Sequence, residues 1–132
     1  MRNVKKGILR FSNEKKANVD LRDQNFEKAD CYRTDFRKSI FEGLNMRAAK
    51  FKHCDFTGAN LRNTNLTGVN FKGCNLSKAD LTGAVLKSCV LEGANFKDAI
   101  ITGATFENSN TAKAKNLNIG IPAVEKADGD GQ

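Results

Sequence analysis

The chain has 132 residues, of which 22 are Lys or Arg and 15 are Asp or Glu, so its formal net charge is +7. That length predicts a single domain. One His and no Trp argue against many classes of enzyme. No apolar run approaches the roughly 20 residues of a membrane-spanning helix, and no apolar stretch of signal length follows the basic start. The composition therefore predicts a cytoplasmic protein without a membrane partner.

The first element, residues 1–18, is predicted to be an N-terminal cap. A regular five-residue pattern starts at Val19, and it fails before that point because Lys16 stands where a large apolar residue is expected. The segment is basic, yet it contains three apolar side chains that can cover the first turn of the regular part. These are Ile8, Leu9 and Phe11.

The second element, residues 19–110, repeats every five residues. From Leu21 to Phe106, every fifth residue is apolar in all 18 cases, and eight of the nine Phe residues stand at these central positions. The residue two places earlier is Ala, Cys, Ser, Thr or Val in 16 of the 18 units. The residue one place earlier is Asp or Asn in 12 of the 18, and seven of the 11 Gly residues end a unit.

A period of five matches neither a helix, with a period of about 3.6, nor a strand, with a period of about 2. The chain must instead turn a corner once per unit, so that each unit buries one large and one small side chain. Asn, Asp and Gly favour such turns. A single coil of this kind has no core of its own, but stacked coils share one.

The units resemble the pentapeptide-repeat family, whose motif is A-(D/N)-L-x-x, from Val19 to about Asn108. The resemblance implies an all-β fold, a right-handed quadrilateral parallel β-helix with short terminal caps. With four units to a coil, the 18 units make about four to five coils, and residues 20 apart in the sequence stack. One of the resulting inward columns is rich in Phe: Phe36, Phe56, Leu76 and Phe96.

The four cysteines are predicted to be buried, reduced thiols. None belongs to a C-x-x-C pair, which argues against a zinc site. Cys54 and Cys74 stack in one column of small residues, where a disulfide is geometrically possible. Each of these cysteines, however, occupies the small-residue position that Ala takes in other units, so a disulfide is not needed to explain it. The only His, His53, takes the last, exposed place of its unit and is expected in solvent. We expect no metal and no cofactor.

Catalytic motifs are missing from the sequence. It contains no G-x-S-x-G, no G-x-x-x-x-G-K and no H-E-x-x-H. Most carboxylates occupy the turn position before a central residue, so the repeat explains them before acid–base catalysis does. The sequence therefore predicts a protein without enzymatic activity.

Two adjacent sides of the predicted solenoid collect most outward cations. An acidic partner, including nucleic acid, is one explanation, and a solvated basic surface is the other. Aromatic side chains for base stacking are missing there apart from Tyr32. The cations of the first side are Arg33, Lys52 and Lys72, and those of the second side are Arg37, Lys38, Lys78 and Lys97.

The last element, residues 111–132, is predicted to be a C-terminal cap followed by a flexible tail. Three outward apolar residues, Val85, Val90 and Ile100, stand near this end where polar residues are expected. Either the tail covers them, or they contact a partner or a second copy of the chain. Gly120 and Pro122 suit a bent covering segment, which favours a monomer over an end-to-end dimer. The apolar tail residues that would form the cover are Leu117, Ile119 and Ile121.

Three hypotheses of function follow. The first is a scaffold that presents flat sides to a macromolecular partner, in the first place a protein. The second comes from the family resemblance, since some members protect bacterial topoisomerases by imitating DNA. A net charge of +7 argues against that role, because a DNA mimic needs an anionic surface. The third is direct binding of nucleic acid through the basic sides.

Overall fold

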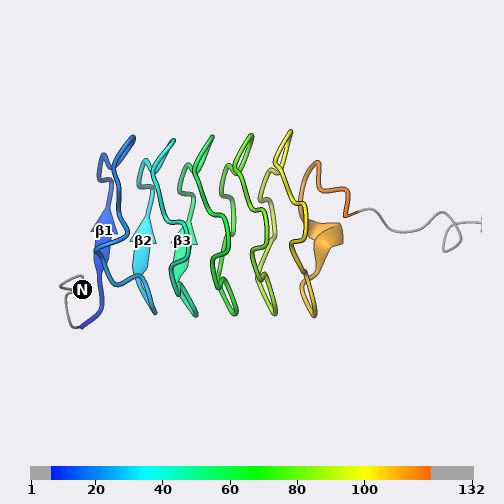
Figure 1. Cartoon of the computed structure of the whole chain (residues 1–132), viewed down its shortest axis with the longest axis horizontal. Coiled ribbons are helices and arrows are strands. Elements are labelled where there is room, and N and C mark those ends of the chain that lie inside the picture. Colours follow the sequence, from blue (N-terminus) through cyan, green and yellow to red (C-terminus); the bar gives the residue numbers. More distant parts are fainter. Residues whose placement is uncertain (1–6, 120–132) are drawn as a thin grey trace, which may run out of the picture.

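The computed structural model of the chain describes residues 7–119, which form a right-handed quadrilateral parallel β-helix. Its square coils lie side by side along the long axis, with the N-terminal coil at one end and the last coil at the other (Figure 1). Three short strands pair in parallel in the order β1-β2-β3, and a single turn of 3-10 helix, η1, follows the last coil. Their bounds are β1 Arg10–Ser12, β2 Asp30–Tyr32, β3 Lys50–Lys52 and η1 Thr111–Lys113.

The coils stack in a constant register of 20 residues. One column of backbone bridges joins Lys15, Asp35, Asp55, Asn75, Asn95 and Lys115. These are five successive steps, and at about 4.8 Å a step the stack is about 24 Å tall. The stacked part therefore extends beyond the predicted range 19–110 at both ends. Residues 10–18 form two sides of the first coil although Lys16 breaks the side-chain pattern, because ladder pairing depends on backbone groups.

Each corner of the coil is a tight turn whose chemistry explains the repeat. The carbonyl oxygen of Phe26 accepts a hydrogen bond from the Ala29 N–H at 3.0 Å, and Lys28 between them has a φ of +62°. A positive φ at the third residue is the signature of a type II turn and favours Gly. The carboxylate of Asp80 accepts the N–H of Thr82 at 3.0 Å. This local bond is the reason for Asp or Asn before most central residues.

Large central side chains fill the interior, as the sequence predicts. The Phe-rich column is confirmed: the rings of Phe36 and Phe56 stack with centroids 5.1 Å apart and an interplanar angle of 22°. Phe51 and Phe71 stack in the neighbouring column at 5.8 Å. The four cysteines are buried and free. Edge-on and offset ring contacts of this kind add to the stability gained from burial.

The N-terminal end of the stack carries a charged side chain at an inward position. The Nζ atom of Lys16 lies 4.7 Å from the ring centroid of Phe11, which is within reach of a cation–π interaction. Lys16, Val19 and Leu21 line an open hollow at this end. An inward charge at the end of a sheet opposes edge-to-edge association, because a second chain docking there would have to desolvate it.

Replacing Lys16 with Leu is therefore expected to promote self-association. The substitution restores the apolar central residue of the repeat and leaves it at an open end of the ladder. Sedimentation velocity over a range of concentrations should show a larger associated fraction than for the parent chain. Lys15→Leu, which adds the same group one position away at an outward place, is the control. Equal behaviour of the two variants would contradict a protective role for Lys16.

Candidate binding surface

The flat side that carries β1–β3, called here the strand side, has an excess of positive charge. Its outward residues include six cations and two carboxylates in the described part of the chain. The cations are Arg10, Arg33, Lys50, Lys52, Lys72 and Lys113, and the carboxylates are Asp30 and Glu92.

The next side along the chain, called the Phe36 side after one of its central residues, is also basic. Six cations and three carboxylates point outward from it. The cations are Lys15, Arg37, Lys38, Lys78, Lys97 and Lys115, and the carboxylates are Asp35, Asp55 and Asp98.

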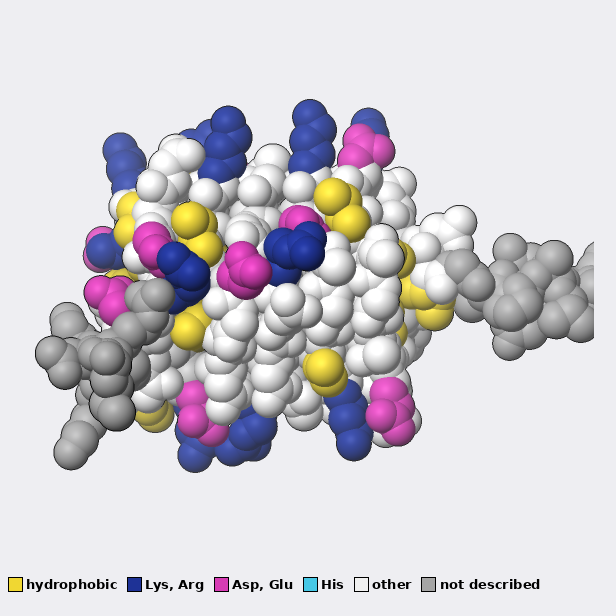
Figure 2. Space-filling view, viewed as in Figure 1, with side chains coloured by type: hydrophobic (Ala, Val, Ile, Leu, Met, Phe, Trp, Pro, Cys, Tyr) yellow, Lys and Arg dark blue, Asp and Glu magenta, His cyan; other side chains and the backbone are white. Residues whose placement is uncertain are grey.

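The other two sides differ in charge. The Phe41 side has two cations against four carboxylates, and the Met46 side has three against two. In Figure 2, Lys and Arg side chains project along the upper edge and, beside acidic groups, along the lower edge of the molecule, while the side facing the viewer mixes basic and acidic groups with uncharged surface. The cation excess thus lies on two adjacent sides. The cations of the Met46 side are Lys28, Arg47 and Lys87.

All seven cations named from the sequence lie on these two sides, and the structure adds Arg10, Lys15, Lys50, Lys113 and Lys115. Arg10 and Lys15 were assigned to a cap, yet they lie in a coil. Lys50 occupies the place before a central residue that Asp or Asn usually takes. Lys115 follows the last regular unit and still pairs with Asn95 through a backbone bridge. Strict 20-residue stacking applied to both ends of the chain would have found Arg10, Lys15 and Lys115, whereas Lys50 lies within the repeat.

Several of these cations already have acidic partners. Arg10 lies 2.9 Å from Asp30, and Arg37 lies 2.7 Å from Asp35. The hydrogen bond from Arg37 lowers the pKa of the Asp35 carboxyl. Exposed pairs of this kind contribute little to stability. In the described part of the chain, no ion pair engages Arg33, Lys50 or Lys52, so their charges are available to a partner.

His53 is exposed, as predicted, but neighbouring groups hold its ring. The ring lies edge-on to Tyr32, with centroids 6.1 Å apart and an interplanar angle of 82°. Arg33 donates a hydrogen bond from Nε to the Tyr32 hydroxyl at 3.0 Å, and its Cζ lies 5.3 Å from the Tyr32 ring centroid. The sequence indicated these residues on one side without showing that they touch.

The apolar residues expected at the C-terminal end do not form one patch. Val85, Val90 and Ile100 are 39%, 46% and 48% exposed, and they belong to three different backbone columns, hence to three different sides. Leu117 packs against the core and is half-buried, whereas Ile119 remains 37% exposed. The described part of the tail brings Ile119 to the hollow that Ile100 also lines, but it leaves all three residues exposed. Ile121 lies outside the described residues.

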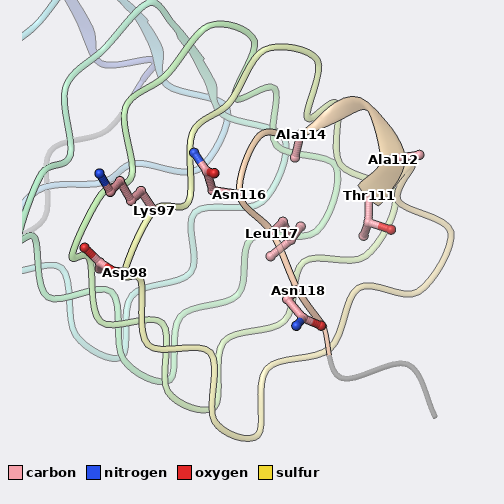
Figure 3. Close-up of a pocket in the computed structure, with 8 residues that line it drawn as sticks. All are labelled: Lys97, Asp98, Thr111, Ala112, Ala114, Asn116, Leu117 and Asn118. Atoms are coloured by element: carbon pink, nitrogen blue, oxygen red, sulfur yellow. The ribbon is translucent and has the colours of Figure 1, made fainter. Parts of the chain in front are cut away.

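An open hollow of about 530 Å³ lies beside this C-terminal segment. Lys97 and Asp98 border it on one side, and Thr111 and Ala112 lie across the segment that carries Asn116 to Asn118 (Figure 3). No group of three or more His, Cys, Asp or Glu residues with metal-binding geometry occurs among residues 7–119. The hollow is wide and its lining lacks a cluster of catalytic side chains, so we assign it no chemistry.

Comparison with models of protein families identifies the family of this chain. The family model for pentapeptide repeats matches eight copies, over residues 17–43, 45–83 and 74–110. The chain belongs to the pentapeptide-repeat family. The family model covers most of the chain, and its matches run through the same coils that the backbone bridges join. No match was found among curated proteins.

Two of the solved structures that match this chain illustrate the shared fold. One is the pentapeptide repeat protein Rfr23 from the cyanobacterium Cyanothece 51142, which is 20% identical, with a TM-score of 0.67; the match covers 82% of this chain and 85% of that protein. The other is a pentapeptide repeat protein from the Arabidopsis thaliana thylakoid lumen, 25% identical, with a TM-score of 0.53 and coverages of 87% and 73%. Between residues 7 and 119, no helix has the length and hydropathy required to span a membrane.

Proposed function

We propose that this pentapeptide-repeat protein is a non-enzymatic docking scaffold that binds an acidic surface of a protein partner through the strand side and the Phe36 side. The observation that carries the proposal is the cation excess of these two adjacent flat sides, with twelve cations against five carboxylates. Complementary charge of this kind steers association and selects partners. We also propose the cytoplasm as the compartment and a monomer as the working form.

The rigidity of the solenoid supports this role. Backbone hydrogen bonds join each coil to the next, as from Phe36 N–H to the Asp55 carbonyl at 2.7 Å and from Asp55 N–H to the Thr34 carbonyl at 3.0 Å. Outward side chains are therefore held on a lattice with a spacing of about 4.8 Å along the stack. A partner binds this lattice without the entropic cost of ordering loops.

Two other functions have weaker support. Imitation of DNA requires a strongly anionic surface, whereas the most acidic side of this protein, the Phe41 side, has only two carboxylates more than cations. Binding of nucleic acid fits the basic sides by charge. However, Tyr32 is the one aromatic residue apart from His53 that is exposed on them in the described part of the chain, and base stacking needs more such side chains.

A pair of charge-reversal variants tests the proposal. Lys78→Glu with Lys97→Glu changes the Phe36 side, and Lys28→Glu with Lys87→Glu makes the same change of net charge at the same repeat positions of the Met46 side. The probe is immobilised poly-L-glutamate, eluted with a salt gradient. We expect at least about tenfold weaker binding for the first variant and a much smaller effect for the second.

Equal loss in both variants would show that net charge alone drives retention, and it would overturn a dedicated binding surface. The same four substitutions are tested on duplex DNA. Stronger binding to DNA than to poly-L-glutamate at equal salt, abolished by the first variant, would favour the nucleic-acid function over the proposed one.

A further inference from the structure

Five polar side chains form a compact cluster on the strand side, over β2 and β3 and the coil that follows them. Lys52 is the ladder neighbour of Tyr32, and Lys72 takes the same place one coil later. Arg33 and His53 occupy the adjacent column at the corner of the coil. We call these residues the anion cluster: Tyr32, Arg33, Lys52, His53 and Lys72.

Three members of the cluster, Tyr32, Arg33 and His53, hold one another in place without a ligand. Arg33 is held against the Tyr32 ring by the hydrogen bond from its Nε to the hydroxyl oxygen. Tyr32 in turn contacts the His53 ring edge-on. In the described part of the chain, no hydrogen bond uses a ring nitrogen of His53. Side chains fixed in this way lose little entropy when they bind an anion.

Gly73 makes room for the His53 ring. A Cβ atom on Gly73 would lie 2.3 Å from His53 Nδ1 and 2.6 Å from its Cε1. The backbone conformation alone does not require Gly, because Lys78 and Ser88 take the same corner position with φ values of +60° and +58°. The missing side chain therefore lets the imidazole lie against Gly73 of the following coil.

The charges of the cluster exceed what neighbouring carboxylates neutralise. Asp30 pairs with Arg10 at 2.9 Å, and Glu92 lies 3.9 Å from Lys72. Arg33 and Lys52 have no such partner among residues 7–119. A carboxylate carries one charge, whereas a phosphate monoester carries about −1.5 to −2 at neutral pH and has three strong acceptor oxygens. The unpaired N–H donors and positive charges of the cluster therefore match a phosphate better than a carboxylate.

We propose that the anion cluster binds a phosphate monoester on a protein partner, of the kind found in phosphoserine and phosphothreonine. The inference rests on the proposed scaffold function and names the anchoring group of the partner. Arg33 and Lys52 supply charge and N–H donors, Tyr32 and His53 supply further polar hydrogens, and Lys72 closes the far side. Nucleic acid fits less well, because Arg33 covers the Tyr32 ring that would stack on a base.

The single His of the chain gives a direct readout. The probe is a short acidic peptide with one central phosphoserine, followed through the Cε1–H resonance of His53 in NMR spectra. We expect this resonance to move on titration, with a dissociation constant at least about tenfold lower than for the same peptide with Glu in place of phosphoserine. Equal affinity for the two peptides would overturn the phosphate specificity. Inorganic phosphate or a DNA oligonucleotide binding as tightly as the phosphopeptide would overturn the assignment to a protein partner.

Two glycine variants distinguish the contribution of the cluster to phosphopeptide binding from effects of net charge and of fold stability. Gly73→Ala should displace the His53 ring and weaken phosphopeptide binding about tenfold without changing any charge. Gly68→Ala is the control, because its φ is +71° and its nearest neighbours are backbone atoms of Ala48 at 3.9 Å. Ala48 itself has a φ of +63°, so the fold accepts Ala at this position.

Equal phosphopeptide binding by the two glycine variants would overturn the role of His53 in the cluster. Binding to poly-L-glutamate through the Phe36 side should be unchanged in both. A failure of the phosphate site is therefore distinguishable from a failure of the scaffold function, which depends on Lys78 and Lys97.

Discussion

Truncation of Phe56 to Ala is expected to lower the free energy of unfolding by about 3–5 kcal/mol. The side chain is fully buried, and its ring centroid lies 5.0 Å from that of Phe51 and 5.1 Å from that of Phe36. It also lies 5.8 Å from the centroid of Phe71 in the next coil. The stacked backbone holds the coils at a fixed spacing, so they cannot collapse into the space that Ala leaves. Urea unfolding followed by circular dichroism measures the change.

Lys87→Ala is the matched control for this truncation. Lys87 is exposed on the Met46 side, and its truncation should change the unfolding free energy by less than about 0.5 kcal/mol. Arg62 is less suitable because it pairs with Asp80 at 3.0 Å. Similar losses for Phe56→Ala and Lys87→Ala would refute the assignment of central residues to the interior.

The sequence alone predicted the inward columns, because the residues within each unit determine the conformation of that unit. A turn after every central residue depends on bonds within a few residues, such as that from Ala29 N–H to the Phe26 carbonyl. The apolar residue at the centre, the small residue before it and the Asp or Asn between them follow from that geometry. Repetition then fixed the register, since a shift of one residue would expose every Phe.

The ends of the solenoid were harder to place. The side-chain pattern fails at Lys16, yet β1 pairs with β2 through backbone atoms. Side-chain patterns report burial, and a terminal coil has one face without a neighbour, so its inward positions tolerate charge. For the same reason, the bridge between Asn95 and Lys115 continues after the apolar pattern stops.

Contacts between outward side chains could not be predicted from the sequence, for a different reason. Stacking by 20 residues predicted that Tyr32 and His53 share a side, but not that His53 lies over Gly73. That contact depends on side-chain torsions and on the missing Cβ of a residue one coil away. A Gly that follows a larger residue 20 positions earlier is a signal worth searching for in other solenoids. Asn63 over Gly83 is a second example in this chain.

The buried thiols are expected to make the fold sensitive to alkaline pH. Burial raises the pKa of Cys54 from its ordinary value of 9.0 to about 12, and that of Cys31 to the same value. Burial also raises the pKa of Cys74, and raises that of Cys89 to about 11. Between pH 9 and 12 the unfolded chain therefore loses thiol protons that the folded chain keeps. Stability falls as pH rises through this window, because the folded state binds more protons.

The variant Cys54→Ala isolates this effect from the titration of Lys and Tyr in the same range. Ala stands at the corresponding place of the next unit, as Ala59, and is fully buried there. A shift from 9.0 to about 12 corresponds to up to about 4 kcal/mol for one thiol. The loss of unfolding free energy between pH 9 and 12 should therefore be smaller in the variant, by an amount approaching that value. Parallel curves for the two chains would show that Cys54 ionises as readily in the folded protein as in the unfolded one, and would contradict its burial.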